Sequence, residues 1–179
     1  RPLLPEPVGK AAVEVSANGL GESLVGGVGD EQMAEAIAIV TGELGPIDAA
    51  LVSHHHHGDN LDAAGRELLA AVGTVVTTTA GARDLGGGAV GLVLWATHRL
   101  EAPGRPAIEV TATPCRHGPP LSRPIVGDVI GFALAWEGQE DGVLWISGDT
   151  VLYDGVREVA RRLDVNLAIL HLGAVRCGL

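Results

Sequence analysis

Apolar positions in this chain follow two periods, and together these periods predict most of its secondary structure. Short apolar or alternating runs bounded by glycine, proline or polar residues predict strands at residues 47–52, 91–95, 108–117, 143–146 and 166–174. Apolar residues three or four apart predict helices at residues 30–40, 60–69 and 151–163, with a shorter helix at residues 80–83. Residues 1–46 show no run that is typical of strands.

The order of the predicted elements indicates a layered α/β fold. Strand, helix, strand and short helix come first, then three strands joined by hairpin-like connections, then strand, helix and strand. This order mixes parallel crossovers with antiparallel pairing and predicts helices on the outside of the sheets. A chain of 179 residues is long enough to bury one core, so we expect residues 1–179 to form a single domain.

The charge and composition of the chain argue against some classes of partner. A formal net charge of −10 disfavours nucleic acid, because such binding depends on Lys and Arg side chains that neutralise phosphates. No apolar run approaches the roughly 18 residues of a membrane span, and no leader of basic and then apolar residues is visible. We therefore expect a cytoplasmic protein that acts on a small-molecule substrate, and leave its oligomeric state open.

Four consecutive histidines, residues 54–57, form the strongest candidate site. They occupy the loop between the predicted strand 47–52 and the helix that follows, which disfavours a purification tag, since tags sit at chain ends. In an extended segment residues two apart point the same way, so His54 with His56, or the pair one position later, can place two imidazoles on one cation. Asp59 falls at the start of the helix, within reach of the same centre.

Three further candidates lie where later predicted strands end. His117 closes an alternating strand and precedes Gly and Pro, Asp149 belongs to a Ser-Gly-Asp-Thr turn, and His171 lies near the end of the last strand. A structural alternative exists for the first two, because a lone histidine is often a satisfied structural residue and an aspartate before a helix can be its N-cap. For His171 we keep two hypotheses open, an orienting contact to a metal ligand or a structural role.

The histidine cluster resembles the signature of the metallo-β-lactamase superfamily, in which an apolar strand ends in Ser-His and continues through x-His-x-Asp-His into a helix that begins Leu-Asp. The residues of this chain that match in kind are Ser53, His54, His56, Asp59, Leu61 and Asp62. Two departures stand out, since one extra residue separates His56 from Asp59, and Asn60 stands where the family usually has a histidine.

Two registers of the metal pair are compatible with this resemblance. We favour His54 and His56, because the Ser-His step is anchored on the end of the strand, and His57 then replaces the lost histidine. A register that starts at His55 fits the spacing without an insertion but moves the pair away from Ser53.

The resemblance extends to the later candidates and implies a metal centre. His117 is similar to the third metal histidine of the superfamily, and Asp149 to the aspartate that bridges two metal ions. The metal ligands implied are His54, His56, His57, Asp59, His117 and Asp149. The resemblance also implies one or two Zn²⁺ ions, for which Mn²⁺ or Fe²⁺ are alternatives, and a catalytic role for Asp59 in accepting and returning the proton of a metal-activated water.

The family-like part of the chain covers residues 44–176, and residues 1–43 are atypical. The fold that the resemblance implies is a four-layered αββα sandwich with its metal loops at one edge of two sheets. The activity it implies is that of a metal-dependent hydrolase of the lactonase-like branch, acting on an ester, lactone or phosphodiester. No histidine follows His171, where the family normally has a further metal ligand, so we expect the chain to be incomplete at one or both ends. The alternative hypothesis is a non-catalytic or degenerate metal-binding relative.

Overall fold

The computed structural model describes residues 13–14, 47–56, 60–121 and 123–171. Within these residues the chain forms two β-sheets and a small number of helices, which confirms the predicted α/β class. The predicted helix at residues 30–40 lies outside the described residues. None of the helices that the structure describes is long and apolar enough to cross a membrane.

The first sheet is parallel throughout. Its strands, in spatial order, are β1 (Val13–Glu14), β2 (Ala49–Val52), β3 (Thr74–Thr78) and β4 (Val90–Leu92). Helix α2 (Ala63–Leu69) connects β2 to β3, and α3 (Thr79–Leu85) connects β3 to β4, because parallel neighbours need a crossover. The short β1 was not predicted, since two residues are too few to form a recognisable apolar run.

Side-chain caps fix where both crossover helices begin. The Asp62 carboxylate accepts a hydrogen bond of 2.7 Å from the Gly65 N–H, so α2 starts at Ala63, three residues later than predicted. The Thr78 hydroxyl accepts a hydrogen bond of 2.9 Å from the Gly81 N–H and starts α3 in the same way.

The second sheet is mostly antiparallel. Its strands, in spatial order, are β5 (Thr97–Leu100), β6 (Ile108–Pro114), β7 (Ile130–Trp136), β8 (Val143–Ile146) and β9 (Val165–Ile169). Strands β5 to β8 pair antiparallel, whereas β9 pairs parallel to β8 after the crossover helix α5 (Asp154–Arg162). A short helix, α4 (Arg123–Val126), lies between β6 and β7. The predicted mixture of parallel crossovers and antiparallel pairing is confirmed.

The chain passes from one sheet to the other at Trp95. The predicted strand at residues 91–95 is wrong in extent, because β4 ends at Leu92 and Trp95 has a left-handed φ of 65°. The Trp95 N–H donates a hydrogen bond of 2.8 Å to the Ala112 carbonyl, and the Ala112 N–H donates one of 2.9 Å to the Ala96 carbonyl. These bonds anchor the turn on β6, the neighbour of β5.

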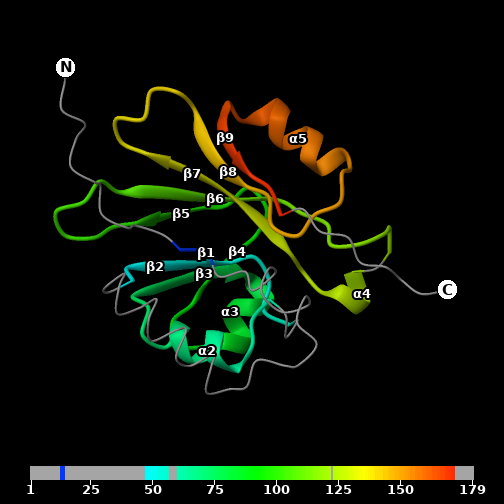
Figure 1. The fold of residues 1–179 in the computed structure, drawn as a ribbon, viewed down its shortest axis with the longest axis horizontal. Coiled ribbons are helices and arrows are strands. Elements are labelled where there is room, and N and C mark those ends of the chain that lie inside the picture. The colour runs from blue at the N-terminus through cyan, green and yellow to red at the C-terminus, as the bar shows by residue number, and fades with distance from the viewer. Residues whose placement is uncertain (1–12, 15–46, 57–59, 122, 172–179) are drawn as a thin grey trace, which may run out of the picture.

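The main core lies between the two sheets. Figure 1 shows the sheets facing each other, with α2 and α3 on the outer side of the first sheet and α5 on the outer side of the second. Leu51 and Val76 of the first sheet and Phe132 of the second are fully buried in one cluster. Val52 points the other way, into a smaller cluster that also contains Leu61 of the segment before α2. Strand β2 is therefore apolar on both faces, as strands of covered parallel sheets are.

The two sheets are joined by a backbone hydrogen bond at the end of β2. The Ile130 N–H, at the start of β7, donates a bond of 3.1 Å to the Ser53 carbonyl. The histidine cluster begins at the next residue, so this bond holds the start of the cluster against the second sheet.

Candidate metal centre

Three side chains from distant loops converge at one edge of the sheets. His54 lies two residues beyond β2, His117 lies three residues beyond β6, and Asp149 lies three residues beyond β8. One donor atom from each lies within 4.8 Å of the other two, and the rings of His54 and His117 have their centroids 5.5 Å apart. Two donors of one tetrahedral zinc ion lie about 3.3 to 3.6 Å apart, so side-chain rotations that bring the three donors closer together would place them on one cation.

His54 is fully buried and held from two sides. Its Nδ1 lies 3.0 Å from the Ser53 hydroxyl oxygen, and its carbonyl accepts a hydrogen bond from the side-chain amide of the buried Asn60. A hydrogen bond at one ring nitrogen is how proteins aim the other nitrogen at a metal ion. Asn60, which departs from the family pattern, thus supports the backbone of the cluster.

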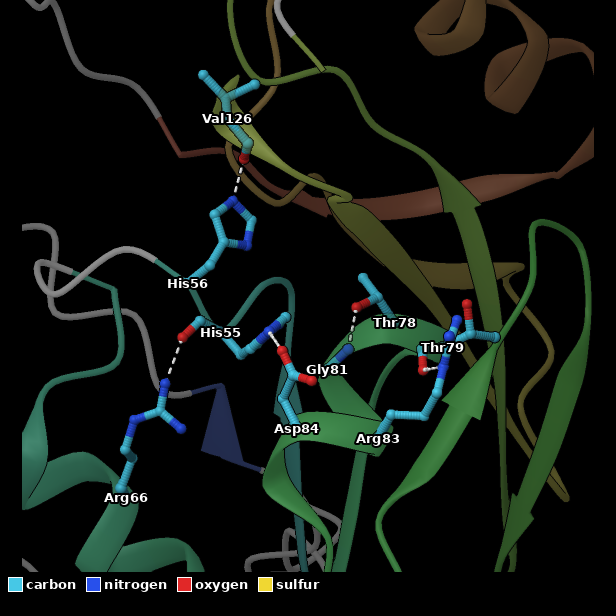
Figure 2. Close-up of polar contacts among 9 residues, drawn as sticks. All are labelled: His55, His56, Arg66, Thr78, Thr79, Gly81, Arg83, Asp84 and Val126. Atoms are coloured by element: carbon cyan, nitrogen blue, oxygen red, sulfur yellow. Dashed lines mark hydrogen bonds and ion pairs between the residues drawn. The ribbon is translucent and has the colours of Figure 1, made fainter. Parts of the chain in front are cut away.

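His56 lies beside the converging group but is not one of its three members. Its ring centroid is 5.3 Å from that of His54, while its Nε2–H donates to the Val126 carbonyl at the end of α4 (Figure 2). The ring packs on Gly127, where an added Cβ would overlap the imidazole and where φ is +70°. The predicted sharing of one ion between His54 and His56 stays a prediction.

His55, the other candidate for the metal pair, points away from the group. Its Nε2 forms a contact of 2.7 Å with the Asp84 carboxylate on α3, and its carbonyl accepts a bond of 2.7 Å from the Arg66 guanidinium on α2 (Figure 2). Among the described residues it is His54, and not His55, that lies with His117 and Asp149, and the choice between the two registers stays a prediction. The periodicity of two explains this result, because His54 and His55 face opposite sides of an extended segment.

The two other residues predicted from the cluster, His57 and Asp59, lie outside the described residues. Their roles as ligands, and the catalytic role of Asp59, stay predictions.

Hydrogen bonds between two loops explain why His117 and Asp149 meet. The Cys115 thiol donates to the Asp149 carbonyl at 3.2 Å, and the Arg116 N–H donates to the Thr150 hydroxyl at 3.1 Å. The Val151 N–H returns a bond of 2.9 Å to the Arg116 carbonyl. The loops after β6 and β8 are thus joined by several hydrogen bonds, although β7 and β8 lie between them in the sequence.

Asp149 is not the N-cap of the helix that follows it. Helix α5 starts at Asp154, three residues later than predicted, and its N-cap position is Tyr153, which makes no side-chain capping bond. The alternative reading of Asp149 as a capping residue is therefore wrong, and the carboxylate faces the two histidines instead.

His171 lies two residues beyond β9 and is held through its backbone. Its N–H donates a bond of 3.1 Å to the Ser147 hydroxyl, and the Ser147 N–H donates one of 3.0 Å to the Ile169 carbonyl. The side chain is not a member of the converging group found among the described residues.

A cleft of about 440 Å³ reaches the group at His117. Its polar and aromatic lining includes Cys115, Arg116, Asp128 and Tyr153. Burial raises the pKa of the Tyr153 phenol, and the nearby Cys115 thiol adds to that shift while Arg116 opposes it. The phenol therefore stays protonated at neutral pH and can donate a hydrogen bond.

Several contacts of the site were not found from the sequence. The His55–Asp84 contact, the seat of His56 on Gly127, and the stacking of Arg116 on Tyr153 all join residues far apart in the chain. A glycine at residue 127 is compatible with a left-handed turn, but the sequence does not indicate that the His56 ring packs against it.

No protein-family model matches the chain, and no curated protein matches it. Among solved structures, the chain is similar to the isothiocyanate hydrolase from Delia radicum gut bacteria, with 19% identity over 73% of this chain and a TM-score of 0.55. It is similar also to a possible metal-dependent hydrolase from Veillonella parvula, with 21% identity over 74% of this chain and a TM-score of 0.54. The chain spans about half the length of each, 51% and 50%. At such identities the likeness establishes a shared fold, and the two proteins with which this chain shares it are described as hydrolases.

Proposed function

We propose that this chain belongs to a metal-dependent hydrolase of the metallo-β-lactamase type, with a metal ion held by His54, His117 and Asp149. The observation that carries the proposal is the convergence of these three donors from three separate loops to within 4.8 Å. Two imidazoles and a carboxylate are the ligand set of several catalytic zinc sites, which keep a fourth position for water. Manganese and iron accept the same donors, so the ion is proposed as Zn²⁺ with these two as alternatives.

The chain's own residues suit such an ion. The hydroxyl of Ser53 orients the His54 ring, and the amide of Asn60 fixes the His54 carbonyl. The bonds between the loops of Cys115 and Asp149 hold two donors together before any ion binds. This preorganisation lowers the conformational cost of binding.

When bound, a divalent ion in this position supplies a Lewis acid and lowers the pKa of a coordinated water to about 7. Asp59, by its place in the resemblance, accepts and returns the proton. The cleft that reaches His117 has room for a small organic substrate, which supports an ester, lactone or phosphodiester as its class. The order of layers, helices outside two facing sheets, supports the αββα sandwich.

A non-catalytic, degenerate metal-binding protein is the second candidate. The observation that favours it is that His56, an expected ligand, is not a member of the converging group found among the described residues. In that case the three converging donors bind an ion, but the water is not activated against a substrate.

Metal content of tag-free protein, measured by elemental analysis, tests the site. We expect one or two ions per chain, lost or strongly reduced in His117→Ala and in Asp149→Ala. His98→Ala is the matched control, because His98 lies on β5 outside the converging group. Metal content that is the same in both site variants as in the wild-type protein would refute the shared site.

Turnover separates the two candidates. The metal-loaded protein is assayed against an activated aryl ester, a γ-lactone and bis(4-nitrophenyl) phosphate, before and after metal removal. Metal-dependent turnover of any of them, lost in Asp149→Ala, supports the hydrolase. Full metal binding without turnover supports the degenerate relative.

A further inference from the structure

Arg116 differs from the arginines that form ion pairs among the described residues and from Arg66 and Arg83, which donate to backbone carbonyls. The chain has 22 acidic and 12 basic residues, and its surface arginines Arg99, Arg105 and Arg157 each lie within 4.0 Å of a carboxylate. The guanidinium of Arg116 makes no such ion pair with any residue that the structure describes, and its Nε is buried without a hydrogen-bond partner there. A buried guanidinium N–H without a partner is costly unless a ligand uses it.

Tyr153 holds this guanidinium in the cleft. The Arg116 Cζ lies 4.4 Å above the centroid of the Tyr153 ring. A stacked guanidinium uses its face on the ring and keeps its N–H groups free at its edge, where they match the two oxygens of a carboxylate or phosphate. The ring itself lies over Gly155, where the lack of a side chain leaves room for it, since any Cβ at that position would overlap the ring.

The rest of the cleft is largely apolar. Its lining includes Leu92, Val93, Leu94, Val126, Val129 and Ile130. Val93 and Leu94 are 62% and 52% exposed, although they are large apolar residues. Exposed apolar side chains gathered around a concave surface are typical of ligand-binding sites. One carboxylate, that of Asp128, also lines the cleft.

The position of Arg116 relates this cation to the metal group. Arg116 and His117 are neighbours in the chain, with Cα atoms about 3.8 Å apart, and both line the cleft. An anionic group held by Arg116 would therefore lie in the same cleft that reaches the proposed metal site.

We propose that Arg116, stacked on Tyr153, binds an oxyanion of the substrate, and that the substrate is an amphipathic acid whose apolar part lies along the cleft. The class rests on the proposed hydrolase, but the anion site can be tested without turnover. The shared chemistry is that of a carboxylate or a phosphate, which the test distinguishes.

The experiment measures binding of phenylacetate, phenyl phosphate and the neutral 2-phenylacetamide by calorimetry. It uses metal-free protein, so that the anions cannot bind an ion instead of Arg116. We expect at least one anion to bind tenfold or more tightly than the amide, and this preference to be lost in Arg116→Gln. Arg116→Lys keeps the charge but not the paired donors, so we expect it to retain part of the preference.

Arg99→Gln is the matched control, because it removes the same charge from an exposed arginine on β5 that does not line the cleft. Tighter binding of phenylacetate assigns a carboxylate substrate, and tighter binding of phenyl phosphate assigns a phosphate. Equal binding of the anions and the amide to the wild-type protein would overturn the proposal, as would a preference that survives in Arg116→Gln while folding is intact by circular dichroism.

A parallel assay separates this proposal from the hydrolase. With metal restored, hydrolysis of a 4-nitrophenyl hemiester that carries a free carboxylate is compared with that of its neutral methyl ester. Failure of both esters argues against the hydrolase and leaves the binding result standing. Hydrolysis of both at the same kcat/KM, unchanged in Arg116→Gln, argues against the anion site and leaves the hydrolase standing.

Discussion

Replacing Gly127 by alanine tests how the histidine cluster is seated. Gly127 has φ +70°, and an added Cβ would overlap the His56 ring. Gly104 has a closely similar φ of +73°, but nothing lies within 4 Å of a Cβ there. The two substitutions therefore share the backbone cost, about 1–2 kcal/mol for a residue with a side chain in a left-handed conformation. Only Gly127→Ala also moves the imidazole.

The difference between the two variants isolates the contact with His56. Displacing the ring breaks its bond to the Val126 carbonyl, which costs about 1 kcal/mol, and overpacking adds about 1–3 kcal/mol where the neighbours cannot move. We expect Gly127→Ala to lower the free energy of unfolding by about 2–4 kcal/mol more than Gly104→Ala does. Urea unfolding followed by tryptophan fluorescence measures both, provided that the slope with denaturant stays equal.

Equal destabilisation of the two variants would refute the reasoning. It would mean that the His56 ring is not packed on Gly127, and the account of why His56 stands outside the converging group would fail with it.

Three further outcomes are expected. Asp84→Ala removes the carboxylate that His55 contacts, and because that carboxylate is 65% exposed we expect a loss of stability of at most about 1 kcal/mol. The control is Asp141→Ala, for which we expect no loss, since Asp141 forms no ion pair with another described residue; a larger loss in the control would contradict the role of the contact. Tyr153 is the single tyrosine of the chain, so the absorbance of phenolate reports its ionisation alone. We expect the midpoint of this ionisation in the folded protein to lie above the ordinary pKa of about 10, and to return to that value in urea. A raised pKa means that the folded state holds the phenol proton more tightly than the unfolded state does. The contribution of this group to stability is therefore complete below about pH 10, the unfolded-state pKa, and is lost as the pH rises through the folded-state pKa. An ionisation midpoint below about 10 would contradict the burial of the ring. With free Zn²⁺ at about 100 times its dissociation constant, bound metal adds about 2.7 kcal/mol, so chelation lowers the Tm by about 5–10 °C, and a Tm that chelation does not change would contradict a folded-state ion site.

Much of the order of the elements could be predicted, because several apolar runs are long enough to show their period. Between α3 and α5, however, the structure has five strands and the short helix α4, where the sequence predicted four strands. The runs at 47–52 and 143–146 correspond closely to β2 and β8, and the predicted helix at 151–163 contains α5. Helix starts were displaced by about a turn, because the capping side chain of Asp62 and the turn before Asp154 decide the first residue.

The candidate site, too, could be predicted only in part from the sequence. The expectation that His54, His117 and Asp149 belong to one centre came from the resemblance and agrees with their convergence. The direction of each histidine in the cluster did not follow from sequence, since it depends on partners far along the chain. His55 contacts Asp84 at a separation of 29 residues, and His56 contacts Val126 at a separation of 70.

These long-range partners tie the site to both sheets. His55 is held by α2 and α3, which cover the first sheet, whereas His56 is held by the segment that leads into β7 of the second. The backbone bond between Ser53 and Ile130 joins the same two sheets one residue before His54. A shift of one sheet over the other would therefore pull adjacent histidines in different directions. The geometry of the proposed metal site therefore depends on the packing of the whole core. If the site binds an ion, substitutions in the sheet interface, such as Phe132→Ala, should weaken that binding even where they lie far from any ligand.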